Sequence, residues 1–293
     1  MANILMFHHF HDKNKHYKGQ GSFNKKMFEK VIKKIGIKNI ANSIHDIKKK
    51  NKFFFTFDDG LASQHDIALP ILNKYKIKGI FFIHTNREYS RIEIFRYFRH
   101  KYFKTINQFY DFFYKTLNEE KIFISKKNFK EIEILKIKQS KLYKYHTQED
   151  LKFRIIRDNF LSHKQYEKIL FKMMKIKKFN YKKSNVNFFM TDKNIKNIFE
   201  NNHYIGIHSH SHSTDISSKS YYNQLKDYSK NKKILEKLIN SKIFLASYPC
   251  GKYNSNSLKV MRKLNINYAF IDTINKKKFH KYKIPRINSA SLI

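Results

Sequence analysis

Short apolar runs of four or five residues recur along the sequence, and longer stretches with helical spacing separate them. Runs of this length, bounded by polar or glycine-containing segments, are typical of buried strands. We expect seven or so strands, at residues 4–7, 53–57, 79–83, 204–207, 243–246, 268–271 and 284–287, with a further short one at 37–40.

Apolar residues spaced by three and four positions predict helices between these strands. Ser22 is the expected cap of the first helix and Gly36 its stop, and Thr191 is the expected cap of the helix before strand 204–207. Further helices are predicted around 67–75, 225–239 and 258–264.

The alternation of strand and helix predicts parallel pairing with crossover helices, in a barrel or an open parallel sheet. Residues from about 87 to 190 break this alternation. They are rich in Phe, Tyr, Lys and Ile, and they show helical spacing with no clear strand. We therefore interpret the chain as a single domain, 1–293, that carries a helical insertion at about 87–190.

The formal net charge of +38 is consistent with either a surface for nucleic acid or a compositional bias. The lysines are spread along the whole chain, Trp is absent, and Gly and Pro are scarce. This distribution favours bias over a dedicated nucleic-acid surface. No nucleic-acid motif is recognised, so we expect no specific nucleic-acid partner, although peripheral contact with a membrane surface stays open.

A single cysteine, Cys250, excludes an intrachain disulfide and permits a reducing compartment. The N-terminal residues lack the pattern of an export signal, and no apolar segment approaches transmembrane length. We expect a cytoplasmic protein without a transmembrane segment.

Three polar clusters each follow a predicted strand, at 58–60, 208–212 and 248–251. In a barrel or an open parallel sheet the carboxyl ends of the strands meet at one rim, so the three clusters are expected together. One carboxylate and two imidazoles are a usual ligand set for a catalytic ion such as Zn²⁺. Such an ion would also relieve the repulsion between Asp58 and Asp59, so that Asp59 binds it while Asp58 stays free as a base.

Each cluster has a plainer interpretation when it is taken alone. Asp-Asp-Gly is typical of a turn, and alternating His and Ser form a polar loop or an adventitious metal tract. Cys250 alone is a packing residue and His8 alone a structural one. Their succession after consecutive strands is what favours a site.

The motifs resemble those of the polysaccharide deacetylases, also known as the NodB-homology or carbohydrate esterase family 4 domain. Thr56-Phe57-Asp58-Asp59-Gly60 is similar to the first motif of that family. His208-Ser209-His210-Ser211-His212 is similar to the second, and Tyr248-Pro249-Cys250-Gly251 resembles the third-motif loop. The resemblance covers about 1–86 and 190–293, and it implies a deformed (β/α)7-type barrel with a helical insertion.

Carried over by position, the resemblance implies a divalent metal ion on Asp59, His208 and His212, most often Zn, with Co, Ni or Mn as alternatives. Asp58 would be the general base. The backbone N–H of Cys250 would stand where the family has an oxyanion-hole donor, a role that needs no particular side chain.

The sequence departs from the commoner family pattern at two positions. Ser247 stands where many members have an arginine, and no late Leu-His-Asp-like motif supplies an acid. A subgroup that acts on surface polysaccharides has a Tyr-His near the N-terminus and a Pro-Arg near the end of the domain. The resemblance therefore implies His8 as the acid, with His9 as the fallback, and Arg286 as the partner of Asp58.

The expected function is removal of N-acetyl groups from sugars of a surface polysaccharide or its precursor, with an N-acetylated saccharide as substrate. Such an enzyme is a hydrolase acting on carbon–nitrogen bonds other than peptide bonds. If the protein is an enzyme, the alternative substrates are peptidoglycan, an O-acetyl ester or a non-sugar amide. An alternative of another class is a non-catalytic basic protein that binds nucleic acid or acidic glycan.

Overall fold

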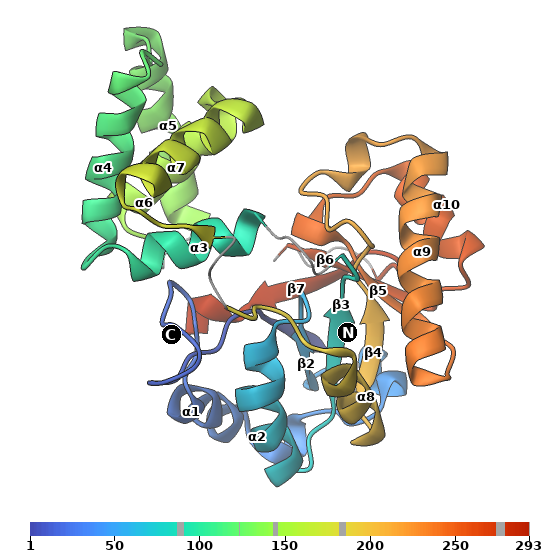
Figure 1. Ribbon diagram of the computed structural model, residues 1–293. Coiled ribbons are helices and arrows are strands. Elements are labelled where there is room, and N and C mark those ends of the chain that lie inside the picture. Colours follow the sequence, from blue (N-terminus) through green and yellow to red (C-terminus); the bar gives the residue numbers. More distant parts are fainter. Residues whose placement is uncertain (87–90, 123, 143–145, 182–185, 274–278, 293) are drawn as a thin grey trace. The chain divides into compact units, whose positions relative to one another are not determined.

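The computed structural model describes residues 1–86, 91–122, 124–142, 146–181, 186–273 and 279–292. The chain divides into two compact units (Figure 1). The first consists of Met1–Ser90 and Asn187–Ile293, and the second of Arg91–Val186.

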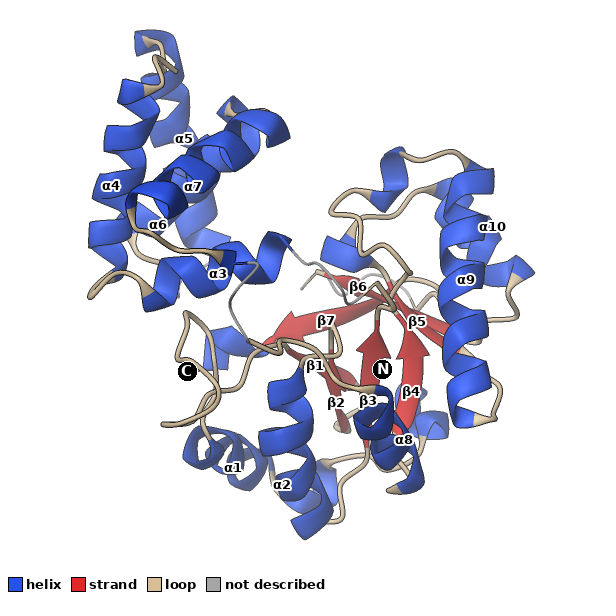
Figure 2. Cartoon of the chain, in the orientation of Figure 1, coloured by secondary structure: helices blue, strands red, loops and turns tan. Residues whose placement is uncertain are grey.

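Seven parallel strands form a closed barrel in the first unit (Figures 1 and 2). They are β1 (Asn3–Phe7), β2 (Phe53–Phe57), β3 (Gly79–Ile83), β4 (Tyr204–Ile207), β5 (Leu245–Ser247), β6 (Tyr268–Asp272) and β7 (Ile284–Asn288). Their order around the barrel is their order in the sequence, and β7 pairs with β1 at Leu5↔Ile287 to close it. Of the two predicted architectures, the α/β barrel is thereby confirmed and the open sheet is excluded.

The strands bury both faces, and the two faces belong to different layers. Alternate residues form an apolar cluster inside the barrel, whose strand members are Ile4, Phe54, Ile80, Phe82, Leu245, Phe270 and Ile284. The residues between them pack against the helices in a larger outer cluster, as Phe55 and Phe57 do against Phe28 of the first helix. Burial on both faces explains why the strands read as continuous apolar runs.

A glycine on the inner face of β4 makes room for the ring that fills the barrel. A Cβ on Gly206 would lie 2.4 Å from Cδ1 of Phe82, far inside contact distance. Phe82 itself is fully buried and lies 5.2 Å from the ring of Phe270 across the interior. Packing at this level thus depends on the missing side chain at 206.

Helices of the first unit surround the barrel (Figure 2). They are α1 (Lys25–Ile35), α2 (Leu69–Lys74), α8 (Asp192–Glu200), α9 (Tyr221–Ile239) and α10 (Ser255–Lys263), and a π-helix at Gln64–Ala68 precedes α2. The helices predicted around 67–75, 225–239 and 258–264 are confirmed. Thr191 is the N-cap of α8, where it forms a capping box with Asn194, and Gly36 ends α1 with φ 80°.

Three local predictions are wrong. Asn24, not Ser22, caps α1, because the Ser22 hydroxyl is engaged with the Gly19 carbonyl and the His11 ring. The segment 37–40 is a 3₁₀ turn at Ile37–Asn39 and not a strand, since Ile37 faces solvent and is 50% exposed. The strand expected at 243–246 begins two residues later, at Leu245.

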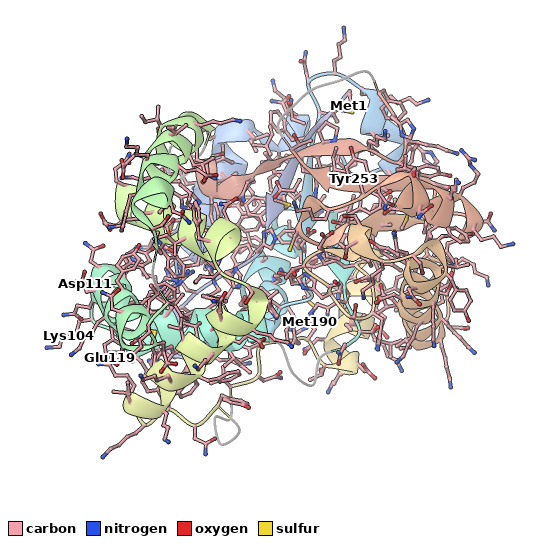
Figure 3. The ribbon with its side chains drawn as sticks, turned by 90° about the horizontal axis from the view of Figure 1, so that it is seen from above. Met1, Lys104, Asp111, Glu119, Met190 and Tyr253 are labelled. Atoms are coloured by element: carbon pink, nitrogen blue, oxygen red, sulfur yellow. The ribbon has the colours of Figure 1, made fainter. Side chains whose placement is uncertain are left out.

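The described elements of the second unit are helical. They are α3 (Arg91–Lys101), α4 (Ile106–Glu119), α5 (Lys126–Leu142), α6 (Gln148–Ile155), a π-helix at Ile156–Phe160, and α7 (His163–Ile176). An aromatic core holds this unit together, with Phe109 and Phe113 of α4 against Phe153 of α6. Exposed charged residues such as Lys104, Asp111 and Glu119 extend from its periphery (Figure 3).

A buried carboxylate links two helices of this unit. Asp150 of α6 accepts hydrogen bonds from the Tyr110 hydroxyl at 2.5 Å and from Nε of Arg154 at 2.9 Å, and it pairs with His146. Burial would raise the pKa of Asp150, but His146 and Arg154 hold this pKa far below its usual value. A paired, ionised carboxylate therefore joins α4 to α6.

Within the described residues, no helix combines the length and the apolar character that a membrane crossing requires.

The buried histidine His203 makes the stability of the barrel depend on pH. Its Nδ1 accepts the Gly79 N–H at the start of β3, and its Nε2 lies 2.9 Å from Oδ1 of Asn73, so the ring is held neutral. Burial, with a smaller effect of Lys78, lowers the pKa of His203 to about 4. The unfolded chain therefore binds this proton more readily, and stability is lost as the pH falls from about 7 toward 4.

We expect His203 to cost about 2 kcal/mol of unfolding free energy between pH 7 and pH 5. Urea unfolding at both pH values would measure this, with His203→Asn keeping an acceptor for Gly79 but no titrating ring. The wild-type protein should lose more stability than His203→Asn. His45→Asn, at an exposed histidine, is the control and should behave like the wild type. Equal pH dependence in wild type and His203→Asn would contradict the prediction.

Candidate functional site

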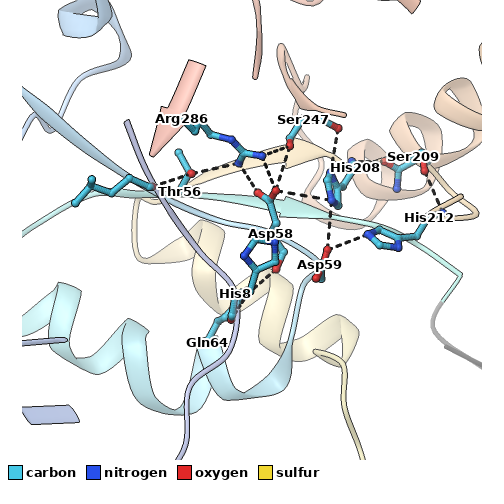
Figure 4. Close-up of polar contacts among 12 residues, drawn as sticks. His8, Thr56, Asp58, Asp59, Gln64, His208, Ser209, His212, Ser247 and Arg286 are labelled. Atoms are coloured by element: carbon cyan, nitrogen blue, oxygen red, sulfur yellow. Dashed lines mark hydrogen bonds and ion pairs between the residues drawn. The ribbon is translucent and has the colours of Figure 1, made fainter. Parts of the chain in front are cut away.

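Polar side chains line the mouth of the barrel at the carboxyl ends of the strands, where the inward-facing alternation continues past the apolar layer (Figure 4). On β2 the successive inward positions are Phe54, Thr56 and Asp58. The same alternation leads to His8 after β1, His84 after β3, His208 after β4, Ser247 on β5 and Arg286 on β7. Six of the seven strands thus contribute a polar side chain to this mouth of the barrel.

Asp58 and Arg286 form a buried, bidentate ion pair. The two terminal nitrogens of Arg286 each donate to one Asp58 oxygen, both at 2.6 Å, and the two residues are 2% and 1% exposed. Burial alone would raise the pKa of Asp58, but the guanidinium, with His208 and His8, holds it below its usual value. These residues are 228 positions apart in the sequence, and the fold brings their side chains into contact.

Ser247 and Thr56 complete the surroundings of the guanidinium. Nη2 of Arg286 donates to Oγ of Ser247 at 2.7 Å, and that hydroxyl donates to Oδ2 of Asp58 at 3.2 Å. Nη1 also lies 3.3 Å from Oγ1 of Thr56, and the guanidinium carbon lies 5.5 Å from the centre of the Phe82 ring. Charge-assisted bonds and stacking therefore hold Arg286 in one orientation.

Asp59, His208 and His212 bring three ligand atoms to one point. Oδ1 of Asp59 lies 3.3 Å from Nε2 of His208 and 3.0 Å from Nε2 of His212. Burial raises the pKa of Asp59, but the two imidazoles outweigh it and hold this pKa well below its usual value. The three donor atoms lie within 4.8 Å of one another, which suits a single small ion.

A break in the strand geometry turns Asp59 toward the histidines. Its φ of 79° is in the left-handed region, so its side chain leaves the alternation that Asp58 follows. Gly60, at φ 67°, continues the turn, and a Cβ there would lie 2.9 Å from Cγ2 of Ile83. The adjacent carboxylates therefore have different partners: Asp58 pairs with Arg286, and Asp59 faces the two histidines.

A hydrogen bond to the backbone fixes the tautomer of His208. Nδ1 lies 3.0 Å from the Ser247 carbonyl oxygen, which can only accept, so Nδ1 carries the proton. The lone pair on Nε2 then points to the Asp59 side. Metal-binding histidines are oriented in this way, so the residues present fit a Zn²⁺-like ion with open positions.

The third histidine of this segment, His210, lies outside the cluster. Its Nδ1 is 2.8 Å from Oγ1 of Thr85, and its carbonyl accepts the Asn86 N–H. Burial, together with Lys230, lowers the pKa of His210. Alternating histidines in a sequence thus need not share a ligand role.

His8 lies near both carboxylates, so that a positive charge on its ring would lower the pKa of Asp58 and of Asp59. Its backbone carbonyl accepts a hydrogen bond from Gln64 at 2.8 Å, and its ring stacks 6.3 Å from that of His9. Cys250 is exposed and has a φ of 52° in the 3₁₀ turn Pro249–Gly251. The proposed role of its N–H stays a prediction.

Sequence reasoning missed two buried residues at this mouth. His84 is 2% exposed, and its ring lies 5.1 Å from that of His212. Gln64, in the π-helix before α2, donates to the carbonyls of both His8 and Asp58. Counting two residues past Phe82 on the inner face would have found His84, whereas no pattern in the sequence marks Gln64.

A protein-family model described as polysaccharide deacetylase matches residues 166–269, just over a third of the chain. The match includes β4, the His208–His212 segment and β5. It confirms the resemblance predicted from the motifs. No curated protein matches the sequence significantly.

Solved structures of deacetylases share the fold. A Streptococcus pyogenes deacetylase, PplD, in complex with acetate, has 16% identity and a TM-score of 0.55, with 98% of this chain and 91% of that chain covered. IcaB from Ammonifex degensii has 13% identity and a TM-score of 0.54, with 99% and 94% covered. A de-N-acetylase from Aggregatibacter actinomycetemcomitans has 13% identity and a TM-score of 0.55, with 98% and 94% covered. At these identities the likeness shows the fold.

Removing one partner of the buried ion pair should destabilise the barrel strongly. Arg286→Met leaves the Asp58 carboxylate buried without its guanidinium, and we expect a loss of about 3 kcal/mol or more in unfolding free energy. Denaturant unfolding of the metal-free protein measures it. Arg262→Met, at an exposed arginine of α10, is the matched control.

A double-mutant cycle separates the pair from its packing. Because Asp58→Asn removes the stranded charge, Asp58→Asn/Arg286→Met should be less destabilised than the sum of the single variants. Additive losses would mean that the pair contributes no coupling.

Proposed function

We propose that this chain, which the family match and the barrel fold relate to the polysaccharide deacetylases, is a metal-dependent hydrolase that removes N-acetyl groups from sugars. The observation that carries the proposal is the juxtaposition at one mouth of the barrel. An arginine-held carboxylate, Asp58, adjoins a ligand cluster of Asp59, His208 and His212. A base beside a metal cluster is the arrangement that hydrolysis of an amide requires.

Asp59, His208 and His212 would hold the ion, through Oδ1 and the two Nε2 atoms. When bound, a Zn²⁺-like ion polarises the acetamide carbonyl and lowers the pKa of water toward about 7. Co, Ni or Mn would serve the same donor set. The Nδ1–H bond of His208 to the Ser247 carbonyl keeps one ligand correctly oriented for this.

Asp58 would accept the proton of the attacking water. The lowered pKa of Asp58 keeps it ionised near neutral pH, so it is ready to act as a base. Arg286 and Ser247 hold its carboxylate from the barrel side. Nε2 of His208 lies 3.9 Å from Oδ2 of Asp58, so base and ligand cluster share one small volume.

Breaking the carbon–nitrogen bond requires a proton for the departing amine, which is otherwise a poor leaving group. A protonated His8, which lies near both carboxylates, would donate it, with His9 as the fallback. The Cys250 N–H would stabilise the oxyanion. Acetate and a free amino sugar are the products.

The substrate we propose is an N-acetylated sugar of a surface polysaccharide or its precursor. Among the structural neighbours one is described as a de-N-acetylase, which supports an amide over an ester. The second unit would belong to the same deacetylase domain. Peptidoglycan fragments, an O-acetylated sugar and a non-sugar acetamide are the competing substrates for a panel.

The proposal predicts acetate release from N-acetylated oligosaccharides in the presence of a divalent ion. Asp58→Asn should lower the rate by 10²–10⁴-fold, because the proton acceptor is lost. Chelation should abolish activity, and added Zn²⁺ or Co²⁺ should restore it. Asp46→Asn, near the opposite mouth where Ile47 bonds the Ala2 N–H, is the control. Activity that survives both Asp58→Asn and chelator would rule out this mechanism.

His8→Ala should lower the rate about 100-fold while the metal content of the protein stays unchanged, because only the acid is removed. His9→Ala is its matched control, since the two rings are neighbours. Metal content by mass spectrometry accompanies each rate. A large loss in His9→Ala with none in His8→Ala would transfer the role to His9.

A further inference from the structure

The segment His208–His212, here called the ligand loop, has a backbone conformation that is unfavourable at two of its residues. Ser209 and His212 both have positive φ, at 60° and 48°. The left-handed conformation is unfavourable for residues with a Cβ, so other contacts must impose it. Because the loop carries two of the three proposed ligands, whatever imposes its shape also sets the distance between their nitrogens.

Asp227, in the second turn of α9, bonds the middle of the ligand loop. Its Oδ1 accepts the backbone N–H of His210 at 2.6 Å and that of Ser211 at 3.1 Å. Its Oδ2 accepts the Ser211 hydroxyl at 2.5 Å, and Lys219 lies 3.4 Å away. One carboxylate, only 10% exposed, thus collects three donors from two consecutive residues between the ligands.

The same face of α9 also holds the first residue of the loop. Asn231, one helical turn after Asp227 and fully buried, accepts the His208 N–H at 2.9 Å. Its amide group donates to the Ile83 carbonyl at 3.0 Å and to Oγ1 of Thr85 at 3.1 Å. Asn231 therefore bonds α9 to the ends of β3 and β4. These bonds fix the position of α9, and hence of Asp227, relative to the two strands.

The last residue of the loop depends on the middle. The His212 N–H donates to Oγ of Ser209 at 3.1 Å, a bond inside the loop. With residues 210 and 211 held by Asp227, this bond closes the turn and brings Nε2 of His212 to 3.0 Å from Asp59. Without Asp227, two backbone donors and a hydroxyl in the middle of the turn lose their acceptor.

We propose that Asp227 is a positioning residue for the metal site, which fixes the ligand loop so that His208 and His212 converge on Asp59. The inference rests on the proposed function, because it needs a metal ion at these three residues. It goes beyond that function in assigning metal affinity to a residue that does not bind the ion. Outer partners of metal ligands typically control affinity by 10–100-fold.

A purely structural role would have a different signature. If Asp227 only joined a helix to a loop, its loss would lower the stability of the metal-free protein and leave the dissociation constant of the ion unchanged. A positioning role changes that constant, together with the coordination geometry. Binding of the metal alone separates the two roles without a substrate.

The experiment is a titration of metal-free protein with Co²⁺, followed by visible absorption, and with Zn²⁺ in competition with a chelator. Asp227→Ala should weaken both ions by about 10–100-fold and alter the Co²⁺ spectrum. Asp227→Asn, which keeps an oxygen for the two N–H groups, should recover most of the affinity. Circular dichroism and urea unfolding establish that each variant is folded.

Asp215→Ala is the matched control. Asp215 lies in the connection between β4 and α9 that also contains the ligand loop. It accepts hydrogen bonds from Ser217 and Ser218, which are outside that loop. Asp215→Ala should leave the metal affinity unchanged, even if it lowers the unfolding free energy as much as Asp227→Ala does.

The failures are distinguishable. Asp227→Ala with wild-type affinity, beside a large loss in His212→Ala, would overturn the positioning role and leave the metal site intact. Wild-type affinity in both His208→Ala and His212→Ala would overturn the metal site itself and with it the proposed function. Equal losses of affinity in Asp215→Ala and Asp227→Ala would also overturn the positioning role.

Discussion

The buried pair between Asp58 and Arg286 is the interaction on which the mouth of the barrel depends. A carboxylate that is 2% exposed is stable as an ion only with a partner in place, and Arg286 supplies two bonds to it. The arginine in turn needs Ser247, Thr56 and the face of Phe82. Residues of four strands, β2, β3, β5 and β7, therefore meet around one charge pair.

The alternation of strand residues explains how much of this could be predicted. Apolar runs in the sequence locate the seven strands, and polar residues just past them locate the rim. Asp58, His208 and Arg286 were predicted, because each follows or belongs to such a run and matches a family motif. Asp59 was marked by its place beside Asp58 after the strand and by the motif, but its departure from the alternation, with a φ of 79°, is a property of the folded turn.

What the sequence did not reveal depends on contacts between distant segments. Nothing in the local sequence distinguishes Gln64 or Asp227 from the other polar residues of their helices. Their partners include backbone groups of other segments. The cap of α1 was misassigned to Ser22 because two capping residues stand close together, and tertiary contacts decide between them. In the segment 37–40 the two isoleucines differ, since Ile37 is 50% exposed whereas Ile40 is buried and bridges to Phe53, and hydrophobicity alone cannot foresee that.

The closure of β7 on β1 has a consequence for how the protein is made. Asp58 leaves the ribosome early, while Arg286 lies 228 residues later, on the last strand. Until β7 has been synthesised, the Asp58 carboxylate cannot pair with Arg286, and β1 lacks β7 as its neighbour. Such high sequence separation slows folding, because the loop must close before the contact is gained. The mouth of the barrel is therefore completed only when β7 has been made and has paired with β1.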